Sequence, residues 1–343
     1  MYKNKLSLKQ FNMSNSNKGI NLSSISVFLP ETILNNDELS AGSAKISEEI
    51  FKRTGVKERR RTCKDFQMSD MACAAAEKIF NSKNELREKI DALILVGHGF
   101  EYKAPVTSAI LHQRLGLNKN CLVLDVPHGC TGYIYGLSIA KGFLSSQIAK
   151  NVLLLTSDTP SYVIDKNDAE LQSLFGDAAT ATIVQSSEEN EKFVFGTDGS
   201  GYEDLIVRRS GTRNPATIDW ITKTGLIHGK MEMRSTEIFT FAIKIVPVLI
   251  YDILEKNNMK IEDIDYFVFH QANSFLLEVI RKKLKIQKEK FFNDITLTGN
   301  TVSSSIPLAL HTAEKNGVLR SGMKVLIAGF GIGLSWGGTI IKY

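Results

Sequence analysis

Short apolar runs alternate with longer amphipathic stretches along most of this 343-residue chain. Bounded runs of four to eight apolar residues are typical of buried strands, and a 3.6-residue periodicity indicates helices. The pattern predicts strands over residues 91–97, 121–126, 151–157, 265–269, 292–297 and 324–328, and helices over 108–115, 133–148, 274–284 and 306–316. This alternation predicts an α/β protein built from βαβ units, with sheets that are mixed but largely parallel.

The order of these elements occurs twice. In each copy a strand is followed by a histidine (His98, then His270), and the next strand is followed by a candidate site residue (Cys130, then Asn300). We therefore expect two duplicated halves, residues 21–190 and 191–343, which meet near the polar stretch 185–192. A pseudo-twofold axis between them would bring Cys130 and Asn300 to one site. Residues 1–20 form a polar leader that we expect to be disordered.

Composition narrows the class of protein. The chain is 43% hydrophobic and 23% charged. Its net charge of +5 is mild and its basic residues are scattered, which does not indicate nucleic-acid binding. Four cysteines without C-x-x-C or zinc-type spacing favour a reduced, cytoplasmic protein. The longest apolar stretch, 238–254, contains Lys244 and Pro247 and is shorter than the roughly 20 residues of a membrane span. We expect it to be a buried helix.

The strongest chemical signal is Cys130, in the segment Val-Pro-His-Gly-Cys-Thr-Gly. A thiol between a strand and a helix lies at the positive end of the helix, and the flanking Gly129 and Gly132 allow close approach. This setting favours a thiolate nucleophile near neutral pH. A free cysteine is more often a small buried hydrophobic residue, which is the alternative for Cys130. Cys63, Cys73 and Cys121 lack this setting, and we interpret them as structural.

Two further residues complete a candidate site. His270 follows an apolar strand, at the edge where α/β proteins place ligands, and Asn300 lies in Thr-Gly-Asn-Thr. An amide beside an imidazole offers two donors to a carbonyl oxygen that gains negative charge, and losing one such donor costs about 3 kcal/mol. The run Gly-Phe-Gly-Ile-Gly (329–333) is followed by a β-like stretch rather than a helix, so backbone donors facing Cys130 are favoured over a dinucleotide loop.

Weaker candidates surround these three. His98 and His128 could line the site, although a packed or solvated role is equally compatible with the sequence. A basic stripe formed by Arg281, Lys282, Lys283 and Lys285 follows His270. Such stripes are usually solvated helix faces, but this one could receive an acidic partner.

Together these residues resemble 3-oxoacyl-acyl-carrier-protein synthase III, the condensing-enzyme branch of the thiolase superfamily. The resemblance runs from about residue 21 to the C-terminus. Its motifs are FKRTGVKERR (51–60), the Cys130 segment, LFGDAA (174–179), HQAN (270–273), GNT (299–301) and GFGIGLSW (329–336). It implies a thiolase-like, five-layered αβαβα fold and a homodimer, with a heterodimer as the alternative.

The resemblance also implies a site and a reaction. Cys130, His270 and Asn300 would form the catalytic triad, with the backbone N–H groups of Cys130 and Ile332 as oxyanion hole. Cys130 would be acylated by an acyl-CoA or acyl carrier protein, and a decarboxylative Claisen condensation with malonyl carrier protein would follow. No bound cofactor is implied, since CoA or phosphopantetheine serves as the substrate carrier. The implied pantetheine-binding residues are Arg53, Phe175, Asn273, Gly331 and Gly333, and the implied carrier-docking residues are Arg281, Lys282 and Lys283.

Three positions depart from the family pattern. Ile50 and Ala169 stand where a tryptophan and an arginine commonly flank the adenine of CoA, and Phe275 replaces an arginine tied to carrier docking. Without the two side chains that flank adenine, the protein should bind CoA more weakly. This favours a carrier-protein donor or a specialised pathway over primary fatty-acid initiation.

Alternative functions use the same residues differently. One is an acyltransferase that moves the acyl group from Cys130 without decarboxylation, and another is a non-catalytic subunit paired with an active relative. A papain-like hydrolase also uses Cys, His and Asn, but it does not predict a duplicated α/β plan.

Overall fold

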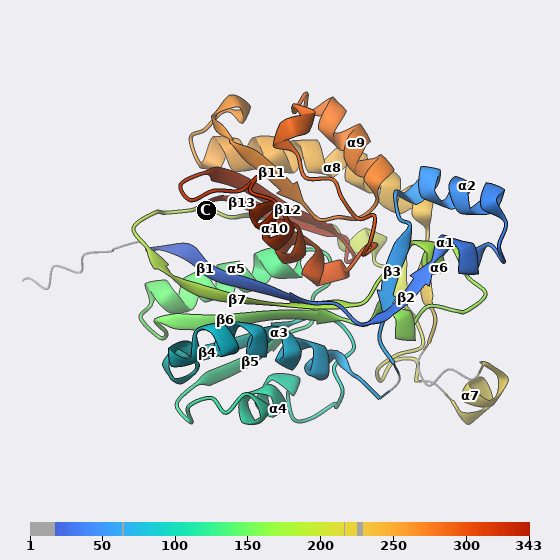
Figure 1. The fold of residues 1–343 in the computed structure, drawn as a ribbon, viewed down its shortest axis with the longest axis horizontal. Coiled ribbons are helices and arrows are strands. Elements are labelled where there is room, and N and C mark those ends of the chain that lie inside the picture. Colours follow the sequence, from blue (N-terminus) through green and yellow to red (C-terminus); the bar gives the residue numbers. More distant parts are fainter. Residues whose placement is uncertain (1–17, 64, 216, 225–228) are drawn as a thin grey trace, which may run out of the picture.

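Two large β-sheets and three layers of helices build the core of the protein, and two small two-stranded sheets lie outside it in the described chain (Figure 1). The computed structural model describes residues 18–63, 65–215, 217–224 and 229–343. Helices α3 (Met68–Ser82) and α4 (Thr107–Arg114) form one outer layer, and α8 (Ser235–Lys256) and α9 (Ser274–Lys283) form the other. Between the sheets lie α5 (Gly132–Ser145) and α10 (Ser305–Lys315). The predicted αβαβα layering is confirmed.

The two sheets share a pairing pattern. The five-stranded sheet has the order β1-β7-β6-β4-β5 and the four-stranded sheet the order β11-β12-β13-β8. Their strands are β1 (Gly19–Phe28), β4 (Ala92–Val96), β5 (Leu122–Val126), β6 (Asn151–Asp158), β7 (Ala178–Ser187), β8 (Val194–Thr197), β11 (Tyr266–Phe269), β12 (Lys324–Gly331) and β13 (Ser335–Lys342). In each sheet one parallel pair, β4-β6 or β11-β12, is followed by two antiparallel pairs.

The sheets are therefore mixed, and the prediction that they are largely parallel is wrong. Within the described chain, parallel ladders join only β4 to β5, β4 to β6 and β11 to β12. The strands β7 and β13 turn back along the preceding strand, and β1 and β8 pair antiparallel with them. An apolar run has the same composition whichever way its neighbour points, so the hydrophobic pattern alone does not distinguish the two arrangements.

Both faces of the central strands are buried, each against a different helix layer. On β4, Ile94 and Val96 face the middle layer whereas Leu93 and Leu95 face α3 and α4. On β11 and β12 alternate residues divide in the same way between the middle layer and α8 and α9. Because successive side chains of a strand point to opposite faces, a strand covered on both sides has a continuous apolar sequence.

The predicted strand over 292–297 is wrong. The described structure has only an isolated parallel bridge there, between Phe291 and Phe267. Beyond that bridge, polar side chains take the place of a strand partner: the Asp294 N–H donates to Gln271 Oε1 (3.2 Å) and the Thr296 N–H to Asp294 Oδ1 (3.1 Å). Local bonds of this kind compete with a strand ladder. The second sheet thus lacks the counterpart of β5.

Smaller elements complete the chain: β2 (Thr32–Asn35), α1 (Asn36–Leu39), α2 (Ala44–Thr54), β3 (Glu58–Arg61), α6 (Ala169–Leu174), β9 (Leu205–Val207), α7 (Ile218–Thr224) and β10 (Met231–Met233). Strand β1 begins at Gly19, two residues before the predicted start of the first half, and the leader up to residue 17 lies outside the described residues. Helix α8 covers the apolar stretch and contains Pro247. Among the helices described, none has the length and apolarity to cross a membrane.

Candidate active site

Cys130 is buried in the loop between β5 and α5. It lies in an apolar cluster with Ile164, Leu171, Leu174, Phe175 and Val302. Gly331, at the end of β12, approaches it so closely that a Cβ on that glycine would lie 2.8 Å from the sulfur. The φ angle of Gly331 is +155°, which also favours glycine. The first half therefore supplies the thiol, and the second half supplies the backbone against it.

The environment of the thiol keeps it protonated in the resting protein. Burial raises the pKa of Cys130 from its ordinary 9.0 to about 12, and the nearby Asp158 raises it further, although the backbone N–H groups of Ile332 and Cys130 lower it. A rise of this size corresponds to roughly 4 kcal/mol. The end of a helix contributes at most ~2 kcal/mol in the opposite direction. Burial therefore opposes the thiolate that a position at the start of a helix favours.

His270 follows β11 directly and is buried. Its Nδ1 lies 2.6 Å from Ser305 Oγ, and its ring meets the edge of Phe330 at 5.7 Å between centroids. Burial lowers the pKa of His270 to about 3, against a hydrogen bond with the Val302 backbone that raises it. The imidazole is thus neutral across the physiological range, and it can accept a proton or donate a hydrogen bond.

Asn300 lies beside Phe175, with which it forms a parallel bridge. The Asn300 N–H donates to the Leu174 carbonyl (2.9 Å), and the Asn300 carbonyl accepts from the Gly176 N–H (3.0 Å). Its side-chain Oδ1 accepts from the Val302 N–H (2.9 Å), and its Nδ2 donates to the Ala272 carbonyl (3.3 Å). Because the amide nitrogen carries two hydrogens, one N–H remains for a ligand.

The three predicted catalytic residues converge on Val302. This residue shares the apolar cluster of Cys130, hydrogen-bonds with His270 through its backbone and donates its N–H to Asn300. Its φ angle is +52°, which is rare for a β-branched residue. Such a conformation costs on the order of 1–3 kcal/mol and persists only where the surrounding structure enforces it.

Sequence reasoning missed a second polar junction beside the thiol. Asp158, at the end of β6, accepts the His98 N–H (2.9 Å) and the Ser303 N–H (3.1 Å), and it also accepts the Ser303 hydroxyl. Burial raises the pKa of Asp158 to about 7, although these donors lower it. A carboxyl group at the carboxyl end of a predicted buried strand was the signal that could have identified it.

The two weaker histidine candidates both lie beside the Cys130 loop. A Cβ on Gly129 would come within 2.7 Å of His98 Cε1, and His128 Nδ1 lies 3.0 Å from Thr131 Oγ1. Burial lowers the pKa of both histidines, that of His98 to about 4.

Most of the residues expected to bind pantetheine lie in this region. Phe175 is buried in the Cys130 cluster, Gly331 touches the sulfur, and Asn273 caps α9 while its side-chain N–H group donates to the Arg53 carbonyl (3.2 Å). Gly333 lies two residues beyond Gly331, between β12 and β13.

Helices α2, α6 and α9 carry the three residues that depart from the family pattern. Helix α9 also carries Arg281, Lys282 and Lys283 of the basic stripe. Ile50 is buried in α2, Ala169 opens α6, and Phe275 is 58% exposed beside Phe239. Arg281 pairs with Glu278 and donates to the Ile286 carbonyl, so its guanidinium is already engaged.

The two lysines among the expected carrier-docking residues are more accessible than Arg281. Lys282 is 70% exposed although it lies 3.5 Å from Glu278, and Lys283 donates to the Ile243 carbonyl (2.9 Å).

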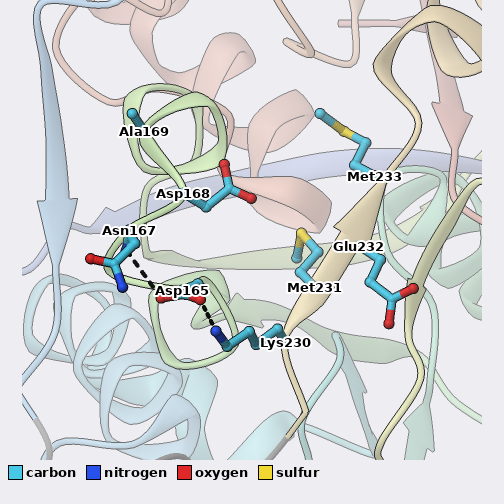
Figure 2. A pocket seen from close by; sticks show the side chains of 8 residues that line it. All are labelled: Asp165, Asn167, Asp168, Ala169, Lys230, Met231, Glu232 and Met233. Carbon is cyan, nitrogen blue, oxygen red and sulfur yellow. Dashed lines mark hydrogen bonds and ion pairs between the residues drawn. The ribbon is translucent and has the colours of Figure 1, made fainter. Parts of the chain in front are cut away.

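A surface hollow of about 620 Å³ lies between α6 and β10, next to the Cys130 cluster (Figure 2). Met231 and Met233 line it and also pack against that cluster. Its polar side chains include Asp165, which pairs with Lys230. The hollow therefore borders side chains that pack against the Cys130 cluster.

Comparison with known proteins agrees with this architecture. Two family models match, 3-oxoacyl-[acyl-carrier-protein] synthase III over residues 124–199 and the C-terminal part of the same family over 254–343. The beta-ketoacyl-[acyl-carrier-protein] synthase III of Clostridium acetobutylicum is 33% identical over 92% of this chain and 96% of its own.

Solved structures give the same result. A crystal structure of a 3-oxoacyl-(acyl-carrier-protein) synthase III is 37% identical and superimposes with a TM-score of 0.90 over 95% of this chain and 100% of its own. The priming beta-ketosynthase of the R1128 polyketide pathway is 26% identical, with a TM-score of 0.84 over 95% of this chain and 96% of its own.

Proposed function

The chain belongs to the 3-oxoacyl-[acyl-carrier-protein] synthase III family of acyl-thioester condensing enzymes, and from this membership we propose that Cys130 is its nucleophile. The convergence of Cys130, His270 and Asn300 on Val302 carries the proposal. These residues are far apart in sequence and come from both halves, yet a single strained residue connects them.

In the first half-reaction the Cys130 sulfur attacks the carbonyl of an acyl thioester. The carbon–sulfur bond to Cys130 forms, the bond to the donor breaks, and the donor thiol leaves with the proton of Cys130. The backbone N–H groups of Cys130 and Ile332 face the sulfur and stabilise the oxyanion.

In the second half-reaction a malonyl thioester replaces the donor. Its carboxylate leaves as carbon dioxide, and the electron pair of the broken carbon–carbon bond moves to the α-carbon. The enolate oxygen accepts hydrogen bonds from His270 and Asn300. The carbanion then attacks the acyl-cysteine, a carbon–carbon bond forms, and the Cys130 sulfur leaves, which gives a 3-oxoacyl thioester. Two half-reactions through one covalent intermediate predict ping-pong kinetics.

Family membership and the departures from the family pattern indicate which substrate carriers the protein uses. We assign Arg53, Phe175, Asn273, Gly331 and Gly333 to phosphopantetheine. The buried Ile50 and the small Ala169 provide no aromatic or cationic surface for adenine, which supports an acyl carrier protein as donor. The similarity to a priming ketosynthase of a polyketide pathway is compatible with a specialised role. A homodimer and a cytoplasmic location remain parts of the proposal.

The relatives do not favour the alternative functions, a transferase without decarboxylation or a non-catalytic subunit. The decisive experiment incubates the protein with acyl-CoA and acyl-carrier donors of varied chain length and records intact and peptide masses. We expect an acyl adduct on Cys130, and carbon dioxide release once malonyl carrier protein is added. An adduct without carbon dioxide would indicate transfer alone, and no adduct with any donor would refute the nucleophile.

A further inference from the structure

A chain of buried hydroxyl groups connects the Cys130 loop to the backbone of Ile332. His128 Nδ1 lies 3.0 Å from Thr131 Oγ1, and Thr131 Oγ1 lies 2.8 Å from Ser335 Oγ. Ser335 Oγ in turn donates to the Ile332 carbonyl at 2.8 Å. Thr131 and Ser335 are almost completely buried, and they join the start of α5 to the start of β13, 204 residues apart.

Counting hydrogens fixes the direction of this chain. A carbonyl oxygen only accepts, so the single hydroxyl hydrogen of Ser335 is used on Ile332. Thr131 must therefore donate to Ser335, which uses its only hydrogen. Thr131 can then only accept from His128, so His128 must carry a hydrogen on Nδ1.

We propose that His128, Thr131 and Ser335 are positioning residues that hold Ile332 in the orientation in which its N–H faces the Cys130 sulfur. The carbonyl and the N–H of Ile332 belong to adjacent peptide units that share its Cα, so fixing the carbonyl restricts the rotation of both. The neighbouring Gly329 and Gly331 allow close approach to Cys130, but they do not restrain this orientation.

The surroundings of His128 suit this role. Its ring stacks on Tyr135 with 4.1 Å between centroids, which fixes the plane from which Nδ1 donates. Protonation of the ring leaves the Nδ1–H donor in place, so the chain does not depend on the charge of His128. The catalytic consequence rests on the proposed function, because an oriented Ile332 N–H accelerates acylation only if Cys130 is the nucleophile.

Substitution of Thr131 tests the role in catalysis. Valine has the shape of threonine without its hydroxyl, and the Thr131 side chain makes no capping hydrogen bond to α5, so Thr131→Val breaks the chain without removing a cap. We expect the kcat of Cys130 acylation to fall roughly tenfold, less than for outright loss of an oxyanion donor, while KM changes less than twofold. Thr131→Ser keeps the hydroxyl and should restore acylation to within threefold of the unmodified protein. Equal acylation in Thr131→Val and the unmodified protein, or equal losses in both variants, would overturn the proposal.

The tautomer of His128 provides a second readout that is independent of activity. Long-range ¹H–¹⁵N correlation spectra of the unmodified protein should show a protonated Nδ1 and an unprotonated Nε2 for His128, assigned by the loss of its signals in His128→Asn. The opposite tautomer would refute the chain even if acylation proceeds normally. If the protein never forms an acyl adduct on Cys130 but shows the Nδ1–H tautomer, the proposed function fails and the hydrogen-bond chain stands.

Discussion

Each sheet has a histidine just past the end of a buried parallel strand, but the two histidines are held in different ways. After β4, Gly97 intervenes, and the backbone N–H of His98 donates to the buried Asp158. After β11, His270 follows at once, and its ring contacts Ser305 and the edge of Phe330. The first histidine is anchored to a carboxyl group through its backbone, whereas the second contacts a hydroxyl group and an aromatic edge through its ring.

This difference separates two chemical roles within one repeated plan. In the second half, apolar burial without a carboxylate partner keeps the His270 imidazole neutral. In the first half, the carboxyl group of Asp158 joins the end of β6 to the loop that carries Asn300, through Ser303. In the proposed function the first half therefore provides the thiol and the Asp158 anchor, and the second half provides the imidazole and the amide that donate hydrogen bonds.

The largest expected effect tests the contribution of the first half. Cys130→Ala should abolish acyl loading, a loss on the order of 10⁴-fold or more in turnover, because the thiol that forms the thioester is removed. Intact mass after incubation with acyl donors measures loading, and thermal unfolding checks the fold. Cys121→Ala, outside the site, should load normally. An adduct that persists on another residue of Cys130→Ala would contradict the assignment.

The contribution of the second half is tested at His270. His270→Ala and Asn300→Ala should each slow decarboxylation by roughly 10²- to 10³-fold, because an enolate donor is lost. Acyl loading should fall less than decarboxylation in either variant. His98→Ala is the matched control on the equivalent strand end, and we expect it to slow decarboxylation less than tenfold. Equal losses for His98→Ala and His270→Ala would remove the difference between the two histidines.

The approach of the second half to the thiol is tested with two glycines. Gly331→Ala places a methyl group 2.8 Å from the Cys130 sulfur at a φ of +155°, and we expect loading to fall by about 10²-fold. Gly142→Ala is the control in α5, where a Cβ meets no atom within 4 Å. That substitution should leave loading unchanged and stabilise the helix by about 0.5–1 kcal/mol, measured by denaturant unfolding. Normal loading in Gly331→Ala would show that the loop has room to move.

Periodicity predicted most of the elements, because continuous apolar strands and amphipathic helices depend on local sequence, whereas the layering was implied by the family resemblance. The prediction failed where local and tertiary contacts compete. Residues 292–297 were predicted to form a strand, but Asp294 accepts the Thr296 N–H locally and no strand ladder forms there. Strand direction at β7 and β13 was likewise not encoded in hydropathy.

In the candidate site, too, the features that depend on local sequence were predictable and those that depend on tertiary contacts were not. Cys130, His270 and Asn300 were recognisable because each follows a predicted strand within a distinctive motif. The protonated state of Cys130 and the junction at Asp158 depend on burial and on partners that are distant in sequence, so periodicity carried no signal for them.

A smaller effect, on the free energy of unfolding, tests Asp158, the anchor of the first half. Folding raises the pKa of Asp158 from 3.8 to about 7, so between these values the folded protein binds more protons than the unfolded chain. Asp158 therefore makes the free energy of unfolding fall as pH rises through this window. We expect Asp158→Asn to remove this contribution, which is about 4 kcal/mol, and to flatten the curve measured by denaturant unfolding between about pH 4 and pH 7. Parallel curves for the two proteins would show that another group causes the slope.

The smallest expected effect concerns the outer surface of the second half, where only part of the basic stripe is available. Arg281 is engaged by Glu278 and Ile286, whereas Lys282 is 70% exposed. Lys282→Ala should raise the KM for carrier-bound substrates about two- to fivefold, because exposed ion pairs contribute only ~1 kcal/mol or less. The KM for the matching CoA thioesters should not change, which makes the CoA series the internal control. A rise in KM for both donors would place Lys282 at the shared phosphopantetheine path, and no rise for either would move carrier docking to the first half.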